Sequence, residues 1–273
     1  MDWLWLLLLG LGTGTFGVMV GTGGGVVLVP MLLLFFNIEP AVVAGTSLAL
    51  VAVNSFSGSV VYLRRQIVDK RSGLMFAAAA LPGSILAPFA VKEVAGDTFR
   101  ALFAVLLMGI ALYMLYRSVW PLRSGDPPSH LVTTAVRGRS MTLDGETFEY
   151  EFNEALAAGF NFVLGFISAF FGTGGGFLRT PVLVVAFGFP VRVAVATSIF
   201  ALSIYATAGA GVHALLGHVE WYPTFVAAGA GLLVGSQIGV WLVSKVKSEW
   251  TVRMLIALLL VMGVRLLVQA VRG

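Results

Sequence analysis

The chain has 273 residues, of which 58% are hydrophobic and 11% are charged, with a formal net charge of +4 and no cysteine. Soluble domains carry roughly 25% charged residues, so this composition predicts a multi-pass membrane protein in contact with the lipid bilayer. The absence of cysteine excludes disulfides, thiolate metal sites and cysteine nucleophiles. No contiguous basic run exists, so the positive charge indicates basic loops beside a membrane and no nucleic-acid partner.

Apolar segments follow one another along the chain, at residues 3–20, 26–36, 41–63, 74–91 and 98–119. Comparable segments recur at about 155–171, 177–187, 192–216, 224–243 and 252–271. Most of them approach or exceed the roughly 17 to 25 residues that a helix needs to cross the hydrocarbon core. We therefore expect an all-α polytopic fold.

A glycine-rich motif occurs once in each set of apolar segments. The sequence Gly-Thr-Gly-Gly-Gly at residues 21–25 returns at residues 172–176, and each copy runs on to a proline, Pro30 or Pro181. At the same separation, the Gly-Thr-Ser of residues 45–47 pairs with the Ala-Thr-Ser of residues 196–198. An ordered series at constant spacing predicts a duplication, with a first membrane repeat over residues 1–120, a polar linker over 121–153 and a second membrane repeat over 154–273.

The apolar segment that follows each glycine motif is too short to cross the membrane comfortably. It predicts a broken or re-entrant glycine-motif segment, with backbone that must be buried in protein or line a cavity. The number of crossings per repeat is then odd, so we expect two inverted-topology repeats of about five hydrophobic segments each. Residues 64–71 hold four Lys or Arg, whereas the corresponding loop around Glu220 holds none. The positive-inside rule places the first of these loops and the linker in the cytoplasm and both termini outside.

The linker is the most polar part of the chain. Its alternating apolar and polar residues on both sides of Asp144-Gly145 predict a short β-hairpin. We interpret the linker as a spacer between the repeats, with a partner-binding or regulatory segment as the alternative.

The glycine motifs predict an anion site. A glycine-rich turn that opens a helix presents unpaired N–H groups and the positive end of the helix dipole. Two such starts in inverted repeats would converge near the membrane midplane. The alternative interpretation is that glycine only allows helices to pack closely. The candidate substrate-binding residues of the chain are Gly23, Gly24, Gly25, Thr46, Ser47, Asn54, Gly174, Gly175, Gly176, Arg179, Thr197, Ser198 and Tyr205.

Arg179 lies in the first turn of the second short segment, where the first repeat has Leu28. Arginine inside a membrane segment costs at least about 2.5 kcal/mol and normally faces a cavity or a partner. A bound anion would supply that partner; the alternative is an arginine that snorkels to the headgroups. Polar and small residues also form stripes on the third segment of each repeat, typical of a pathway lining or of hydrogen bonds between helices.

His213 is a candidate for proton coupling, with an interfacial hydrogen-bonding histidine as the alternative. His213 and His218 are five residues apart, which would place them on different faces of a helix, so no zinc site and no other metal is expected. Glu39 is a candidate gating or coupling carboxylate, and its alternative is a solvated side chain. The glycine motifs lack the Gly-Lys-Ser/Thr ending of a P-loop, and the sequence predicts no cofactor.

The duplicated G-x-G-G-G…P motifs, each followed by a Thr-Ser pair at the start of the next long segment, resemble the sulfite exporter TauE/SafE family of bacterial membrane transporters. The resemblance covers essentially the whole chain outside the linker. It implies a transporter of sulfite, a sulfonate such as sulfoacetate, or a related sulfur oxyanion. The family motif corresponds here to Gly21 to Gly25, Thr46 and Ser47, and to Gly172 to Gly176, Thr197 and Ser198. The extended linker departs from a minimal eight-helix pattern.

The sequence and the resemblance together predict a secondary transporter that moves a small sulfur-containing anion across the bacterial inner membrane by alternating access. The anion would lie between the two glycine-rich helix starts. An anion channel, or a transporter of a different small carboxylate or oxyanion, is the alternative. A membrane enzyme is disfavoured because no catalytic constellation has the expected spacing. The sequence leaves open the direction of transport, the coupling ion and whether the protein is a homo-oligomer.

Overall fold

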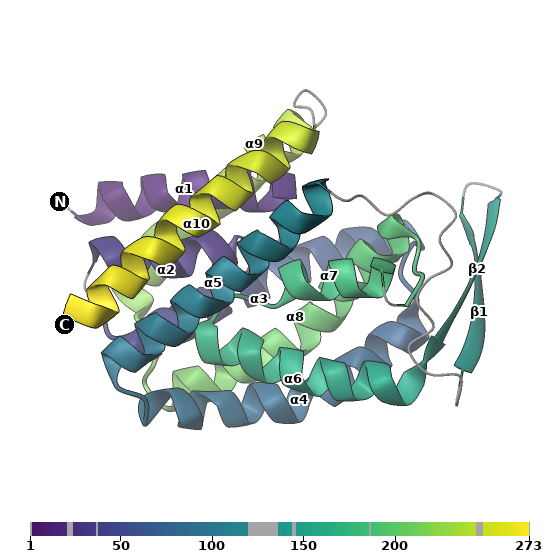
Figure 1. Cartoon of the computed structure of the whole chain (residues 1–273), viewed down its shortest axis with the longest axis horizontal. Coiled ribbons are helices and arrows are strands. Elements are labelled where there is room, and N and C mark those ends of the chain that lie inside the picture. Colours follow the sequence, from purple (N-terminus) through teal and green to yellow (C-terminus); the bar gives the residue numbers. More distant parts are fainter. Residues whose placement is uncertain are drawn as a thin grey trace.

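A computed structural model describes residues 2–20, 24–36, 38–119, 136–143, 146–185, 187–243 and 248–272 of the chain (Figure 1). The helices of the first half are α1 (Asp2–Val20), α2 (Gly25–Phe35), α3 (Pro40–Arg64), α4 (Lys70–Lys92) and α5 (Gly96–Val119). Two strands follow, β1 (Val136–Leu143) and β2 (Glu146–Asn153). The second half contains α6 (Glu154–Phe171), α7 (Gly176–Val185), α8 (Val191–Leu215), the short π-helical turn η1 (Trp221–Phe225), α9 (Val226–Val243) and α10 (Ser248–Arg272).

The helices confirm the expected all-α polytopic membrane fold. Within the described part of the chain, six helices are long and apolar enough to cross a membrane: α3, α4, α5, α6, α8 and α10. The two glycine motifs precede short helices, α2 with 11 residues and α7 with 10. At 1.5 Å per residue each is about 15 Å long, roughly half of the hydrocarbon thickness. Neither short helix crosses the membrane alone.

Local sequence explains where the long helices begin and end. Pro40 occupies the first turn of α3, where the missing N–H has no helical partner to lose. Asp69 caps α4 by accepting a hydrogen bond from the Ser72 N–H, and Asn153 caps α6 in the same way. Gly172 ends α6 in the left-handed conformation, with φ of 71°, which favours glycine.

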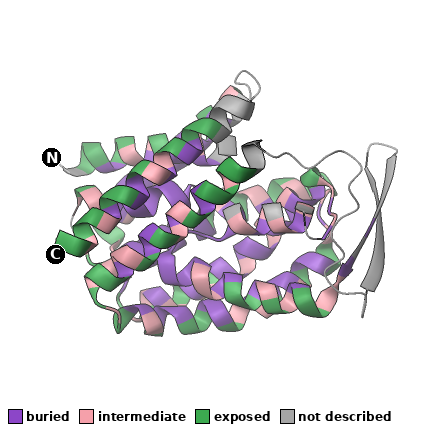
Figure 2. Ribbon diagram, in the orientation of Figure 1, coloured by how far each residue is buried: buried purple, intermediate pink, exposed green. Residues whose placement is uncertain are grey.

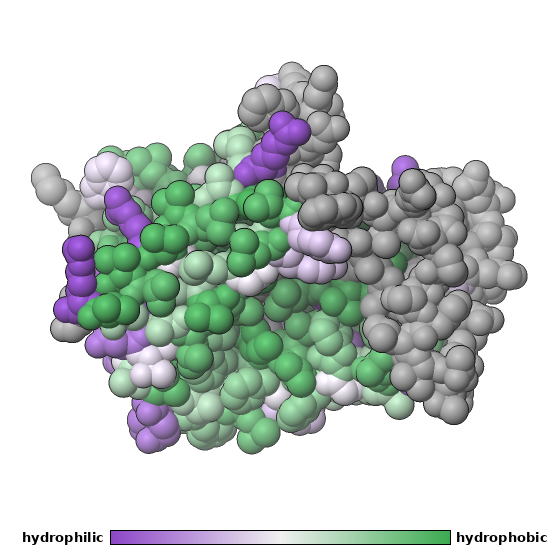
Figure 3. Space-filling model, in the orientation of Figure 1, coloured by the Kyte–Doolittle hydropathy of each residue, from purple (hydrophilic) through white to green (hydrophobic). Residues whose placement is uncertain are grey.

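Helices α3 and α8 pack against each other at the centre of the bundle, with the other helices around them (Figure 2). In both, 67% of the most apolar stretch is buried inside the protein, against 33% in α5 and α10. The peripheral helices therefore present their apolar surface outward. The face seen in Figure 3 is largely hydrophobic. The exposed apolar side chains of the peripheral helices include Phe89 and Val105. An apolar surface of this size is typical of contact with lipid.

Glycine sets the distance between two further helix pairs, α1 with α9 and α4 with α6. A Cβ atom at Gly14 would lie 2.4 Å from the Leu232 carbonyl oxygen, and one at Gly165 would lie 2.1 Å from the Ala80 oxygen. Backbones in contact at these positions leave no space for a side chain. Small residues are the usual means by which membrane helices approach so closely.

The loops at the two ends of α8 lie at opposite ends of the bundle. The Asp69 N–H donates a hydrogen bond to the Thr197 hydroxyl near the start of α8, while Glu220 follows the end of the same helix. Both termini lie at one end of the molecule and the β-hairpin lies at the other (Figure 1). The hairpin is at the Asp69 end, because the Tyr150 hydroxyl of β2 donates a hydrogen bond to the Asp69 carboxylate at 2.7 Å.

Strand β2 belongs to the packed core of the protein. It pairs antiparallel with β1 and carries the buried side chains Tyr150 and Phe152. These two rings pack with Phe76 of α4 and with Phe187 and Phe189, which precede α8. The second strand of the linker therefore packs against the helical bundle, and the spacer interpretation of the linker stays a prediction.

Candidate functional site

The two glycine turns have the same local geometry at the start of their short helices. Gly24 and Gly175 both have positive φ, 89° and 63°, and occupy the same position in the two motifs. The Gly24 carbonyl accepts hydrogen bonds from the Val27 and Leu28 N–H groups. The Gly175 carbonyl accepts from residues 178 and 179 in the same way. Each turn therefore opens a helix whose first N–H groups are left without helical partners.

The glycine turns of the two halves touch each other. A Cβ atom at Gly25 would lie 2.6 Å from the Thr173 carbonyl oxygen, and one at Gly174 would lie 2.4 Å from Cγ1 of Val51. Glycine at these positions lets the two backbones and α3 meet. Gly23, the remaining candidate of the first motif, lies outside the described residues.

Arg179 is fully buried in the first turn of α7. Its Nε donates a hydrogen bond to Oδ1 of Asn161 at 2.7 Å, and its Nη1 lies 3.4 Å from the Ser198 carbonyl oxygen. The guanidinium carbon lies 4.7 Å from the centre of the Tyr205 ring, in a cation–π contact. Among the described residues, Arg179 forms no ion pair with a carboxylate. Within the described part of the chain, this buried positive charge therefore has no matching negative one.

Hydrogen bonds hold the residues around Arg179 in place. The Tyr205 hydroxyl donates to the Gly174 carbonyl at 2.9 Å, which ties α8 to the second glycine turn. The Asn161 amide donates to the Ala157 carbonyl at 2.7 Å, so its oxygen faces the arginine. A Cβ atom at Gly175 would lie 3.0 Å from the Tyr205 hydroxyl and 3.5 Å from Oγ of Ser168. The second glycine turn, Tyr205 and Ser168 are therefore neighbours.

Several buried donors in this region lack a partner among the described residues. They are Nη2 of Arg179, Oγ of Ser168, Oγ1 of Thr173, Oγ of Ser198 and Oγ of Ser47. A buried polar group without a hydrogen bond costs about 1 to 3 kcal/mol, and more if it is charged. An oxyanion accepts hydrogen bonds from hydroxyl, guanidinium and backbone N–H groups alike. The arrangement is therefore chemically suited to a small anion.

Thr46 and Thr197 both hold loops through their hydroxyl groups, and their role in substrate binding stays a prediction. The Thr46 hydroxyl accepts a hydrogen bond from the Glu220 N–H at 2.9 Å, and the Thr197 hydroxyl accepts one from the Asp69 N–H at 3.1 Å. Each threonine lies near the start of a central helix and holds a loop of the other half. Both hydroxyls keep a hydrogen atom that can be donated.

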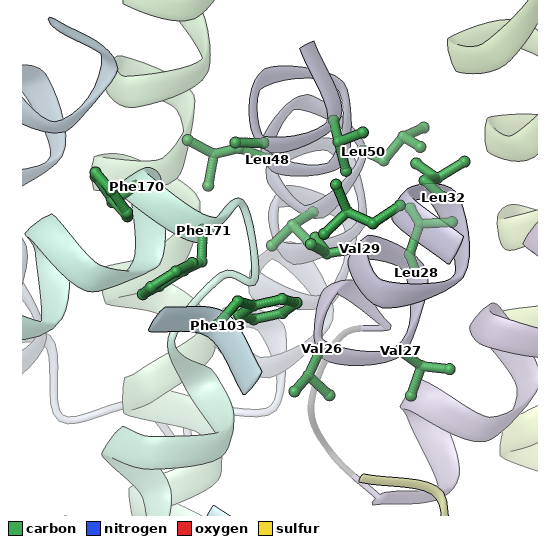
Figure 4. Close-up of a cluster of buried hydrophobic side chains, with 14 of the residues drawn as sticks. Val26, Val27, Leu28, Val29, Leu32, Leu48, Leu50, Phe103, Phe170 and Phe171 are labelled. Atoms are coloured by element: carbon green, nitrogen blue, oxygen red, sulfur yellow. The ribbon is translucent and has the colours of Figure 1, made fainter. Parts of the chain in front are cut away.

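The first half contributes mainly apolar residues. Leu28 takes the place of Arg179 and is fully buried in a hydrophobic cluster. Figure 4 shows the side chains of α2 beside Leu48 and Leu50 of α3, with Phe103 and Phe171 nearby. Asn54, the first-half counterpart of Tyr205, lies 3.5 Å from the Ser236 hydroxyl of α9. A separate cavity of about 760 Å³ between α1, α2 and α10 is lined mostly by apolar residues and contains none of the candidate residues.

The coupling candidates lie elsewhere. His213 is fully buried, and its Nδ1 lies 3.3 Å from Nδ1 of His218. The expectation that the two rings face different sides is wrong, because α8 ends at Leu215 and the chain turns back at Gly217. Glu39 is exposed in the segment before α3.

Sequence reasoning missed Asn161 and Ser168. Both lie in α6, in an apolar segment where a carboxamide needs a partner. The corresponding positions in the first half are Gly10 and Gly17, just as Leu28 corresponds to Arg179. The sequence did contain a signal for these residues, because polar residues that occur in only one repeat can pair with one another.

The apolar helices and the buried polar site are typical of a membrane transporter. The chain matches the Sulfite exporter TauE/SafE family over residues 6–266 and belongs to that family. The probable membrane transporter protein YunE of Bacillus subtilis is 29% identical over 266 residues, which cover 93% of each chain. The probable membrane transporter protein ORF9 of a Sinorhizobium species is 28% identical over 221 residues, 81% of this chain and 75% of its own. No solved structure matches the chain.

Proposed function

We propose that this transporter moves sulfite, an organosulfonate or a related sulfur oxyanion across the bacterial inner membrane by alternating access. The observation that carries the proposal is Arg179, fully buried, with a free Nη2 and no carboxylate partner among the described residues. An anion between this guanidinium and the touching glycine turns would balance the charge. Family membership supports the substrate class, and the names of the relatives support transport.

The site favours one negative charge over two. Arg179 brings one positive charge to the site. A monoanion would form a neutral pair with it, whereas a dianion would leave one charge uncompensated in a medium of low polarity. Organosulfonates and hydrogensulfite carry a single charge, and sulfate carries two. We therefore expect tighter binding of the monoanions.

We further infer that the two halves are inverted repeats related by a two-fold axis in the membrane plane. Exchange of the halves converts the α1–α9 pair into the α6–α4 pair, and both pairs are present. The same exchange converts the Thr46–Glu220 hydrogen bond into the Thr197–Asp69 hydrogen bond. The basic loop at residues 64–71 lies at the β-hairpin end, which supports a cytoplasmic hairpin and external termini.

Ligand titration of purified protein tests the proposal, with the shift in melting temperature as the readout. Arg179→Leu should weaken methanesulfonate binding about ten- to a hundredfold, because a charge-assisted hydrogen bond of roughly 1.5 to 3 kcal/mol is lost. Arg179→Lys should restore only part of the affinity, since a point charge replaces a planar fork. Gly175→Ala should also weaken binding, because its Cβ would meet the Tyr205 hydroxyl.

Gly211→Ala is the matched control, since no atom lies within 4 Å of its Cβ position. Unchanged affinity in Arg179→Leu would remove this residue from the site. Tighter binding of sulfate or acetate than of methanesulfonate would contradict the proposed substrate class. Anion flux into liposomes that does not saturate with concentration would identify a channel.

A further inference from the structure

Two buried histidines lie outside the anion site. Nδ1 of His213 lies 3.3 Å from Nδ1 of His218, and Nε2 of His213 lies 3.1 Å from the Ala169 carbonyl oxygen. His213 is fully buried and His218 is 7% exposed. The pair connects the end of α8 and the following loop with the last turn of α6.

The hydrogen-bond partners determine where the protons lie. A carbonyl oxygen only accepts, so Nε2 of His213 carries a hydrogen and Nδ1 of the neutral ring does not. Nδ1 of His218 is then the donor between the two rings, which leaves Nε2 of His218 with a lone pair. This nitrogen can take up a proton without breaking either bond. If Nδ1 of His213 were also protonated, its N–H would point at the N–H on Nδ1 of His218, and the two would repel. The pair therefore accepts only one proton.

Charged groups on two neighbouring elements face His218. Burial lowers the pKa of His218 below its ordinary value, while the Glu39 carboxylate raises it and the Lys92 ammonium at the end of α4 lowers it. The folded protein therefore holds His218 neutral at high pH, and the ring takes up its proton at a lower pH than an exposed histidine does.

The histidine pair and the second glycine turn contact the same turn of α3. A Cβ atom at Gly45 would lie 2.1 Å from the His218 carbonyl oxygen, and one at Gly172 would lie 2.3 Å from the Ala44 oxygen. Ala169, whose carbonyl binds His213, directly follows Ser168 of the anion site. A change in the histidine pair therefore acts on backbone that adjoins the anion site.

We propose that His213 and His218 form a single proton site, and that one proton binds together with the transported anion. This inference rests on the proposed function, because the anion is the second ligand. The positive charge on the protonated pair stabilises an anion in the neighbouring site. By reciprocity, anion binding must then raise the proton affinity of the pair by the same factor.

The test measures the affinity of purified protein for methanesulfonate, which stays a monoanion throughout, at about pH 8 and about pH 5. Affinity of the unmodified chain should rise at least about fivefold at the lower pH, as is typical of linked sites. His218→Asn should abolish the rise, because the amide keeps an N–H near the Nδ1 position but does not titrate. His130→Gln, at the third histidine of the sequence, should leave the rise intact.

Proton release and uptake separate this inference from the proposed function. In weak buffer, the unmodified chain should take up protons when methanesulfonate binds near the midpoint of the titration, and His218→Asn should take up none. Without anion, Arg179→Leu should still bind one proton more than the Arg179→Leu/His218→Asn double variant. Equal proton binding by these two variants, or a pH effect that persists in His218→Asn, would overturn the inference. Loss of anion binding at every pH with the proton difference intact would instead overturn the proposed anion.

Discussion

Asn161 and Arg179 act as one unit at the scale of single residues. The Asn161 oxygen accepts from Nε of Arg179, and its amide is fixed by the Ala157 carbonyl. Neither side chain has a polar counterpart in the first half. Removal of one therefore leaves a buried group of the other without its partner.

Asn161→Ala should destabilise the protein by about 1.5 to 3 kcal/mol, the usual worth of a hydrogen bond to a charged group. In the Arg179→Leu background the same change should cost much less, since no guanidinium remains to be satisfied. Unfolding in detergent, followed for both single variants and the double variant, measures this coupling. Ser55→Ala, which removes a hydroxyl bonded to its own helix, should add independently to Arg179→Leu. Additive effects of Asn161→Ala would show that the two residues act separately.

At the scale of helices and strands, glycine contacts decide which neighbours each helix can have. Gly165→Ala should lower the melting temperature strongly, because its Cβ would lie 2.1 Å from the Ala80 oxygen and must push α6 away from α4. Gly159→Ala on the same helix is the control, since no atom lies within 4 Å of its Cβ position. Thermal unfolding of the two variants is the comparison, and equal melting temperatures would contradict the packing role.

The β-hairpin should matter for stability as well as for connection. Phe152→Ala should cost about 3 to 5 kcal/mol, as for other large aromatic residues that are removed from a core. Replacement of residues 124–148 by a flexible chain, with residues 149–153 kept, should be tolerated far better than replacement of 124–152. The melting temperature and the transport activity of the two replacement variants test this prediction. A fully active and stable protein without Tyr150 and Phe152 would contradict this prediction and support the spacer interpretation.

The topology prediction belongs to the whole molecule. Single cysteines at Lys70 and Glu220 in this cysteine-free chain should react with impermeant reagents from opposite sides of the membrane. The structure supports this result because the two loops lie at opposite ends of α8. Lys245, outside the described residues, should label with Lys70. Labelling of residues 70 and 220 from one side would exclude the inverted repeat.

Periodic features of the whole chain were predictable from the sequence, and contacts between distant segments were not. Length and apolar composition predicted helices that the structure places within a few residues, such as α3 at Pro40–Arg64 against an expected 41–63. The pairing of Asn161 with Arg179 depends on how α6 meets α7, which no local pattern encodes. The histidine pair depends on the end of α8 at Leu215, and an apolar run does not mark that end.

The confinement of Arg179, Asn161 and Ser168 to the second half has a consequence for transport itself. In perfectly symmetric inverted repeats, the outward-open and inward-open states would be related by a two-fold rotation and would have equal energies. Here the polar groups belong to the second half. In the first half, Leu28 and its neighbours form an apolar surface instead. Under the proposed alternating access, the two states would solvate the empty arginine to different extents, so the unloaded transporter would favour one of them. A bound anion would reduce this difference by pairing with the arginine.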